Sequence, residues 1–223
     1  MRVSAIMKTH SVPHDCGFRT ILSLATPHHM LCDHVDISQA FVQGDFLPGD
    51  GYNGKVYISP PPGFTEDQGY VYLLSRPLYG IPSPARAWHT TMSAYLKSKG
   101  CAHVGFERSM WCVTIKRHTI LIASHIDDFM LACADRAMLD TFRQGLLARF
   151  DGTYEGEVHT YLGCEIERDM GAGRTLLSQR HFAEDVLRIF AMWDCTPAIR
   201  KRCSMLTWDF FPTSCWEKNP MLT

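Results

Sequence analysis

Short apolar runs separated by turn-forming residues dominate the chain and predict many strands. In mid-chain, three runs rich in Val, Ile, Leu and Cys follow one another closely, with a polar turn at 116–119 between the first two. Runs of this length between polar turns are typical of strands in an antiparallel sheet. The predicted strands cover residues 31–37, 56–58, 70–74, 111–115, 120–123, 129–134, 161–166 and 174–177.

Four other segments repeat their apolar residues at helical spacing, most clearly at 138–150. Pro84 can occupy the first turn of one helix, Gly100 can terminate it, and Ser178 can cap the last helix. The predicted helices cover residues 17–30, with an end at Pro27, then 84–99, 138–150 and 178–191.

The order of these elements indicates an α+β fold. Strands and helices alternate without a βαβ nucleotide-binding fingerprint, and the sequence has no glycine-rich phosphate loop. An antiparallel sheet with helices on one face fits this order. The 223 residues are enough for one large domain, or for a core domain with a smaller appendage.

Charge and composition narrow the possible functions. The net charge of −1 predicts only weak affinity for nucleic acid, because such domains usually carry a basic surplus. The apolar runs are too short to span a bilayer, and no basic-then-apolar signal segment opens the chain, so we expect an intracellular protein without membrane contact. The nine cysteines are scattered without a Cys-x-x-Cys pair, which argues against a disulfide framework.

Two adjacent aspartates, Asp127 and Asp128, interrupt an apolar hairpin. Neighbouring carboxylates repel each other and resist burial, so a cation is expected beside them. Asp36 occupies a similar apolar setting upstream. Three converging carboxylates make an all-oxygen site that suits Mg²⁺ and two-metal phosphoryl transfer. The alternative for the pair alone is a solvated β-turn, which aspartate also favours.

A zinc site is the other metal hypothesis that the sequence raises. Four potential ligands crowd together upstream of Asp36: His28, His29, Cys32 and His34. Their spacing fits no standard zinc site, and His34 shares a strand face with Asp36. We therefore do not favour a zinc site here.

Seven blocks of sequence, taken in order, resemble the reverse transcriptase domain of copia-type LTR retrotransposons. The first carries Asp36 followed by an Ala-Phe pair and a glycine turn, and the fifth is His125-Ile126-Asp127-Asp128. Each block alone is a weak signal, but their order and spacing over residues 17–197 are specific. The blocks cover residues 36–45, 56–64, 78–81, 86–88, 125–128, 161–166 and 177–183.

The resemblance implies a role for each matching residue. Asp36, Asp127 and Asp128 would be the catalytic carboxylates that hold two Mg²⁺ ions. The backbone carbonyl of Ile37 would face a metal ion. Phe41 would lie under the incoming sugar and exclude a ribose 2′-hydroxyl. Leu162 and Gly163 would form a primer grip.

The resemblance also implies the fold, the partners and the location. The fold would be a polymerase palm with incomplete fingers at 17–197, between an unassigned segment at 1–16 and a divergent, irregular tail at 198–223. The partners would be an RNA or DNA template with a DNA primer, and deoxynucleoside triphosphates. The location would be cytoplasmic, in a virus-like particle.

The sequence departs from the family pattern at three positions around the start of the second predicted helix. Pro82-Ser83 stands where a Lys-Gln pair is usual, and Ala85 stands where a proline is usual. These departures leave open an inactive retrotransposon remnant that keeps a palm-like fold and weak nucleic-acid binding. A metal-dependent nuclease using the same acids is a third, weaker hypothesis.

Overall fold

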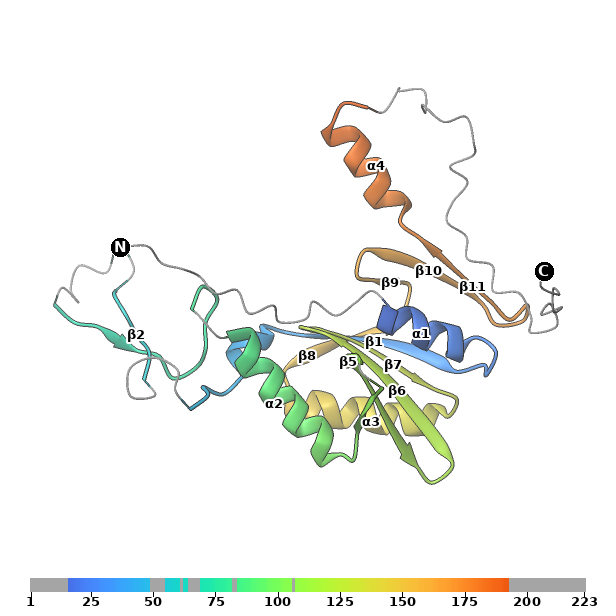
Figure 1. The fold of residues 1–223 in the computed structure, drawn as a ribbon, viewed down its shortest axis with the longest axis horizontal. Coiled ribbons are helices and arrows are strands. Elements are labelled where there is room, and N and C mark those ends of the chain that lie inside the picture. The colour runs from blue at the N-terminus through green and yellow to red at the C-terminus, as the bar shows by residue number, and fades with distance from the viewer. Residues whose placement is uncertain are drawn as a thin grey trace, which may run out of the picture.

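A six-stranded antiparallel sheet forms the centre of the molecule (Figure 1). The structure, a computed structural model, describes residues 16–48, 55–60, 62–63, 69–81, 84–105 and 107–192. The order of strands across the sheet is β4-β5-β6-β7-β1-β8, so β1 lies between β7 and β8. The strands are β1 (Leu31–Ile37), β4 (Ala102–Val104), β5 (Glu107–Ile115), β6 (His118–His125), β7 (Asp128–Cys133) and β8 (Gly152–Glu157).

Two smaller antiparallel sheets accompany the central one. A three-stranded sheet has the order β11-β10-β9, and a two-stranded hairpin joins β2 and β3. Their strands are β2 (Tyr57–Ile58), β3 (Tyr72–Leu73), β9 (Thr160–Tyr161), β10 (Cys164–Asp169) and β11 (Arg174–Ser178).

The four predicted helices are confirmed, with small shifts at their ends. The helices are α1 (Cys16–Ala25), α2 (Pro84–Ser98), α3 (Arg136–Arg149) and α4 (Arg180–Ile189), with a 3-10 turn, η1 (Ala40–Gln43), after β1. Helix α4 begins one residue later than a cap at Ser178 predicts. Gln179 is the N-cap residue, and Ser178 Oγ instead accepts a bond from the backbone N–H of Arg180 at 3.1 Å.

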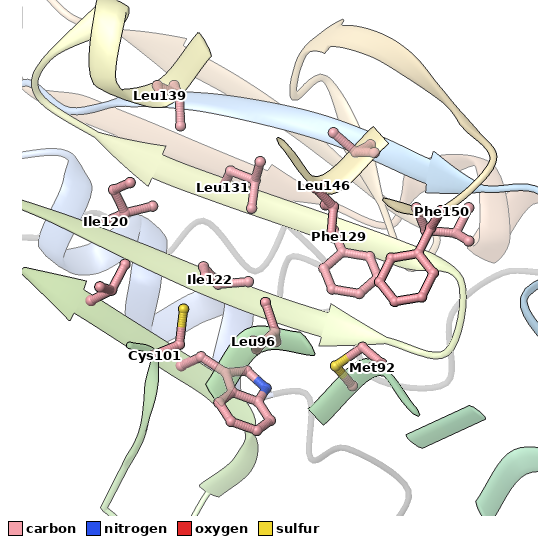
Figure 2. Packing of buried hydrophobic residues seen from close by; sticks show 14 of the residues in the cluster. Met92, Leu96, Cys101, Ile120, Ile122, Phe129, Leu131, Leu139, Leu146 and Phe150 are labelled. Carbon is pink, nitrogen blue, oxygen red and sulfur yellow. The ribbon is translucent and has the colours of Figure 1, made fainter. Parts of the chain in front are cut away.

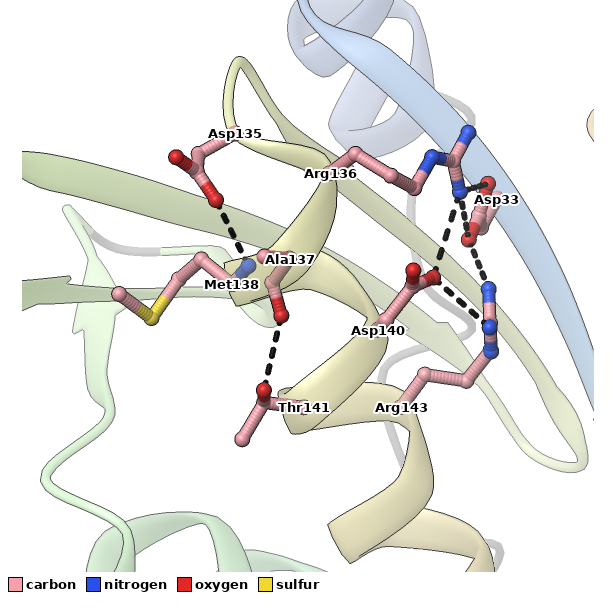
Figure 3. A network of polar contacts seen from close by, with 8 residues as sticks. All are labelled: Asp33, Asp135, Arg136, Ala137, Met138, Asp140, Thr141 and Arg143. Carbon is pink, nitrogen blue, oxygen red and sulfur yellow. Dashed lines mark hydrogen bonds and ion pairs between the residues drawn. The ribbon is translucent and has the colours of Figure 1, made fainter.

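Helix α3 begins where its capping chemistry predicts. Asp135 precedes the helix in extended conformation, and its Oδ1 accepts a hydrogen bond from the backbone N–H of Met138 at 2.8 Å (Figure 3). Helix α2 ends just before Gly100, whose φ of 83° is the left-handed conformation that glycine adopts without strain.

The sheet is covered on both faces by different elements. Helices α2 and α3 pack on one face against Ile122, Phe129 and Leu131, as Figure 2 shows. Helix α1 and the β9–β11 sheet pack on the other face, around Met130 and Tyr161. The prediction of helices on one face is therefore right for α2 and α3 and wrong for α1. The apolar stripe of α1 matches the alternate side chains of the strands, which face away from α2 and α3.

Strands β4 and β8 were not predicted from the sequence, and the single strand predicted at 161–166 is two strands, β9 and β10, separated by a turn at residues 162–163. Strand β8 consists mostly of polar residues and glycine, and most of its side chains are exposed. It forms because its backbone pairs with the edge of β1, where Asp36 lies opposite Thr153 and Ile37 opposite Gly152. Backbone pairing of this kind leaves no hydrophobic alternation in the sequence.

An ion-pair network joins α3 to β1 beneath the sheet (Figure 3). Asp33 is fully buried, and its carboxylate accepts bonds from Arg136 Nη1 at 2.9 and 3.0 Å and from Arg143 Nη1 at 2.5 Å. Arg143 also lies over the ring of Tyr154 in β8, 3.7 Å from the ring centre. The two guanidinium groups compensate the buried charge of Asp33 and fix α3 under β1.

Several predictions fall on parts of the chain that the structure does not describe. These are the segment 1–15, the tail 198–223 and the departure at Pro82-Ser83. Within the described ranges, no helix is long and apolar enough to cross a membrane.

Candidate active site

The first and third predicted carboxylates are direct neighbours across the sheet. Asp36 on β1 lies opposite Asp128 on β7 in the antiparallel register. The next residue on β1, Ile37, donates its backbone N–H to the carbonyl of Asp127 at 2.8 Å. Two backbone relationships thus bring Asp36, Asp127 and Asp128 to the same end of the central strands.

The charges of Asp127 and Asp128 act on the carboxyl group of Asp36. Burial is the largest cause that raises the pKa of Asp36, and repulsion from Asp127 and Asp128 raises it further, while His34 lowers it. Two negative neighbours make ionisation of the Asp36 carboxyl group less favourable, and a bound cation would stabilise its ionised form.

His34 is a member of this cluster that sequence analysis did not assign to the site. Its Nε2 lies 2.9 Å from Oδ1 of Asp128, and both side chains are partly buried, with exposed fractions of 19% and 29%. The signal was present in the sequence, because His34 stands two residues before Asp36 and so shares its strand face.

Tyr161 supports the same hairpin from below and was also not predicted as a site residue. Its ring is buried. Its hydroxyl donates a hydrogen bond to the backbone carbonyl of Asp128 at 3.2 Å, and the carbonyl of Ala123 is a second acceptor at 3.4 Å. Burial, followed by the charges of Asp128 and Asp127, raises the pKa of Tyr161, so the hydroxyl stays protonated as a donor. The edge of the His34 ring meets the Tyr161 ring at a centroid distance of 5.7 Å.

An open pocket of about 470 Å³ extends from this cluster to the β9–β10 turn. Asp128 and His34 line one part of it, and Leu162 and Gly163 line another. Both turn residues have positive φ, 49° and 73°, so the chain reverses sharply there. The structure therefore brings the two predicted primer-grip residues into one pocket with Asp128.

Phe41 and Ile37 place their side chains against the core under α2 and α3. The ring of Phe41, on η1, lies beside the ring of Tyr79, with 4.7 Å between the two centroids. The Phe41 side chain is half-buried and packs against the core of α2 and α3. The side chain of Ile37 is buried in the same core, and Ile37 contacts the turn with the aspartates through its backbone N–H.

The three carboxylate groups are chemically suited to binding a hard divalent cation. Carboxylate oxygens are the preferred ligands of Mg²⁺, and mutual repulsion leaves this cluster short of positive charge. In the described part of the chain, however, no three His, Cys, Asp or Glu side chains are grouped closely enough to hold a metal ion. One oxygen of Asp128 is engaged by His34, and metal binding would have to compete with that contact.

Comparison with known protein families identifies the family of this chain. Residues 11–201 match the family described as reverse transcriptase (RNA-dependent DNA polymerase). The chain belongs to this family. The predicted resemblance to a copia-type reverse transcriptase domain is therefore confirmed, and the matched region contains every predicted site residue. No solved structure gives a significant match.

Similar proteins come from plant retrotransposons. The chain is 26% identical over 213 residues to the retrovirus-related Pol polyprotein from transposon TNT 1-94 of Nicotiana tabacum. The aligned region covers 92% of the chain and 15% of that polyprotein. It is 27% identical over 186 residues to the Pol polyproteins from transposons RE2 and RE1 of Arabidopsis thaliana, covering 82% of the chain and 12% of each relative. The reverse transcriptase domain thus spans a small part of the length of these relatives.

Proposed function

We propose that this chain is the palm, with part of the fingers, of an RNA-directed DNA polymerase that extends a DNA primer by two-metal nucleotidyl transfer. The observation that carries the proposal is the cross-strand pairing of Asp36 with Asp128, with Asp127 tied to the next residue of β1. Family membership supports the same reaction. In this proposal residues 17–197 form the polymerase domain.

Each predicted residue has a task in the proposed reaction. Asp36, Asp127 and Asp128 would hold two Mg²⁺ ions, which activate the primer 3′-hydroxyl and stabilise charge on the triphosphate. His34 would fix the orientation of the Asp128 carboxylate through the contact at 2.9 Å. Tyr161 would hold the backbone beneath that carboxylate.

The substrates would approach from the pocket beside Asp128. Leu162 and Gly163 line that pocket with Asp128 and would hold the primer end, with RNA or DNA as the template. Phe41 would contact the sugar of the incoming deoxynucleoside triphosphate, while Ile37 would offer its backbone carbonyl to a metal. We extend the family resemblance to its cellular setting and propose a virus-like particle in the cytoplasm.

A second candidate is an inactive remnant that keeps the palm-like fold and binds nucleic acid weakly. The contact between His34 and Asp128 favours this alternative, since it occupies a carboxylate oxygen that a metal would need. The lack of a three-ligand cluster among the described residues favours it as well.

A primer-extension assay on poly(rA)/oligo(dT) with Mg²⁺ tests the polymerase proposal on the full chain. We expect extension by the wild type and a loss of at least about 100-fold in Asp128→Asn, because the carboxylates stabilise charge that develops only in the transition state. Asp185→Asn is the matched control, because Asp185 is 64% exposed on α4, far from β7 in the fold.

Thermal stability in Mg²⁺ separates the two candidates. Binding to the native state alone stabilises it by about 2.7 kcal/mol at a ligand concentration 100 times the Kd. The polymerase proposal predicts a rise in Tm with millimolar Mg²⁺ that disappears in Asp36→Ala. No extension, together with equal Mg²⁺ responses of the wild type and Asp36→Ala, would overturn the proposal in favour of the remnant.

A further inference from the structure

Trp88 contacts the turn that carries the paired aspartates. The residue lies in α2, is 1% exposed, and donates its indole Nε1–H to the backbone carbonyl of Ile126 at 2.6 Å. Ile126 directly precedes Asp127 and has a φ of 53°, a left-handed conformation that a β-branched residue adopts only under constraint. The indole bond is a constraint of this kind from outside the hairpin.

The backbone of Trp88 also contacts the segment that follows Asp36. A Cβ placed on Gly44 would lie 2.9 Å from the Trp88 nitrogen and 3.1 Å from its Cα. Gly44 has a φ of −73°, so it is needed there for space and not for backbone freedom. The loop after η1 therefore packs directly on α2 at the residue whose side chain reaches Ile126.

We propose that Trp88 is a positioning residue that sets the distance between Asp36 and the Asp127–Asp128 pair by holding both of their segments against α2. The proposal rests on the proposed function for its catalytic meaning, because the three carboxylates are the metal ligands of that function. Trp88 touches neither substrate nor metal and acts through the backbone of Ile126 and the packing of Gly44.

The position of Trp88 in the core makes it a rigid support. Its ring meets the Phe150 ring nearly at right angles, with 5.0 Å between centroids, and both side chains belong to the core under α2 and α3. Tyr161 bonds the carbonyl of Asp128 from the opposite core. The turn is thus held by one aromatic donor from each side of the sheet, which limits movement of both aspartates.

The chain contains a matched control for Trp88. Trp111 on β5 is also fully buried in the same core, but its Nε1 has no hydrogen-bond partner among the described residues. Trp88→Phe and Trp111→Phe therefore remove the same atoms from the same core. Only the first variant removes a bond to the turn with the aspartates.

Hydrogen exchange tests the positioning role without any need for metal. The reporter is the backbone amide of Ile37, which donates to Asp127 and reports the junction of the two segments. We expect Trp88→Phe to speed exchange of this amide about five- to tenfold relative to the amides of β10, a strand that contains neither tryptophan, which is the effect of losing one hydrogen bond. Trp111→Phe should leave that ratio within about twofold. Equal changes in the two variants would reduce Trp88 to a packing residue and overturn the proposal.

Mn²⁺ binding, followed by electron paramagnetic resonance, tests the consequence for the carboxylates. We expect Trp88→Phe to weaken Mn²⁺ binding about five- to tenfold and Trp111→Phe to leave it within about twofold, a difference that loss of packing alone does not produce. If the wild-type protein and Asp128→Asn bind Mn²⁺ with equal affinity, the proposed function is wrong. The exchange rate of the Ile37 amide still tests the positioning role of Trp88 in that case.

A measurement on the wild type covers the case in which Trp88→Phe does not fold. Both tryptophans are buried to the same degree, so a difference in exchange of their indole protons reports the bond to Ile126. We expect the Trp88 indole proton to exchange at least about tenfold more slowly than that of Trp111. Equal rates would overturn the proposal.

Discussion

Asp36 and Asp128 lie directly opposite each other in the antiparallel pair of β1 and β7. Their backbones are fixed by the ladder of the central sheet, and the bond from Ile37 to Asp127 extends that ladder by one residue. The candidate active site is therefore built on two largely buried strands. Precise placement of catalytic groups requires rigid elements of this kind.

Replacing Asp36 should stabilise the protein when no divalent metal is present. The folded state raises the pKa of Asp36 through burial and repulsion by its neighbours. A carboxyl group with a raised pKa favours the folded state below its ordinary pKa, and this contribution is lost as the pH rises through the raised value. We therefore expect Asp36→Asn to have a higher Tm than the wild type at pH 7, and the gain to vanish at pH 3.

Thermal melts from pH 3 to pH 7, with EDTA and with Mg²⁺, check this prediction. Mg²⁺ should raise the Tm of the wild type and close the gap to Asp36→Asn. A variant less stable than the wild type at pH 7 in EDTA would contradict the electrostatic origin of the shift.

Gly152→Ala should separate β8 from β1 at the site. A Cβ on Gly152 would lie 2.5 Å from the carbonyl oxygen of Asp36 and 3.2 Å from Cα of Ile37, so the backbone must shift. We expect a loss of about 1–3 kcal/mol in the free energy of unfolding, measured by urea denaturation. Gly171→Ala is the control, because its Cβ would meet only a side-chain oxygen of Asp169 at 3.5 Å. Equal losses in the two variants would show that this approach of β8 to β1 is not tight.

Removing the buried charge of Asp33 should destabilise the fold strongly. Asp33→Ala would leave Arg136 and Arg143 with only the partly exposed Asp140 as a shared partner, and the Arg143 side chain is only 13% exposed. We expect a loss of about 3 kcal/mol in the free energy of unfolding, the lower end for a broken buried pair, because Asp140 still compensates part of the charge. Asp185→Ala, which breaks an exposed pair with Arg188, should change it by less than about 0.5 kcal/mol. Urea titrations of both variants check the contrast.

The thiol of Cys32 should be inert in the folded protein. Burial raises the pKa of Cys32 to about 11, from an ordinary value of 9.0, and the nearby Arg168 only partly opposes this. Alkylation at pH 8, mapped by mass spectrometry, should label Cys32 more slowly than the half-buried Cys112. A raised thiol pKa stabilises the folded state fully below pH 9, and this contribution is lost as the pH rises through about 11. Rapid labelling of Cys32 at pH 8 would contradict its burial.

Local signals were sufficient for the helices and for most strands. The amphipathic stripe and Asp135 specify α3, and the proline and glycine at the two ends bound α2, because these signals act within one or two turns of chain. Strand β8 was missed because its polar sequence forms a strand only beside β1. The cap of α4 was misplaced by one residue, within the usual uncertainty of helix ends.

Local patterns in the sequence show which acids are set in apolar strands, and the surrounding motifs show the family. Folding of the whole chain places Asp36 opposite Asp128 and His34 against the same carboxylate, and it brings Tyr161 and Trp88 to opposite sides of the turn. The register of strands far apart in sequence depends on the packing of both faces of the sheet, and no local pattern encodes it. Hydrogen bonds from a distant helix or hairpin to a backbone carbonyl leave no motif, because every residue has such a carbonyl.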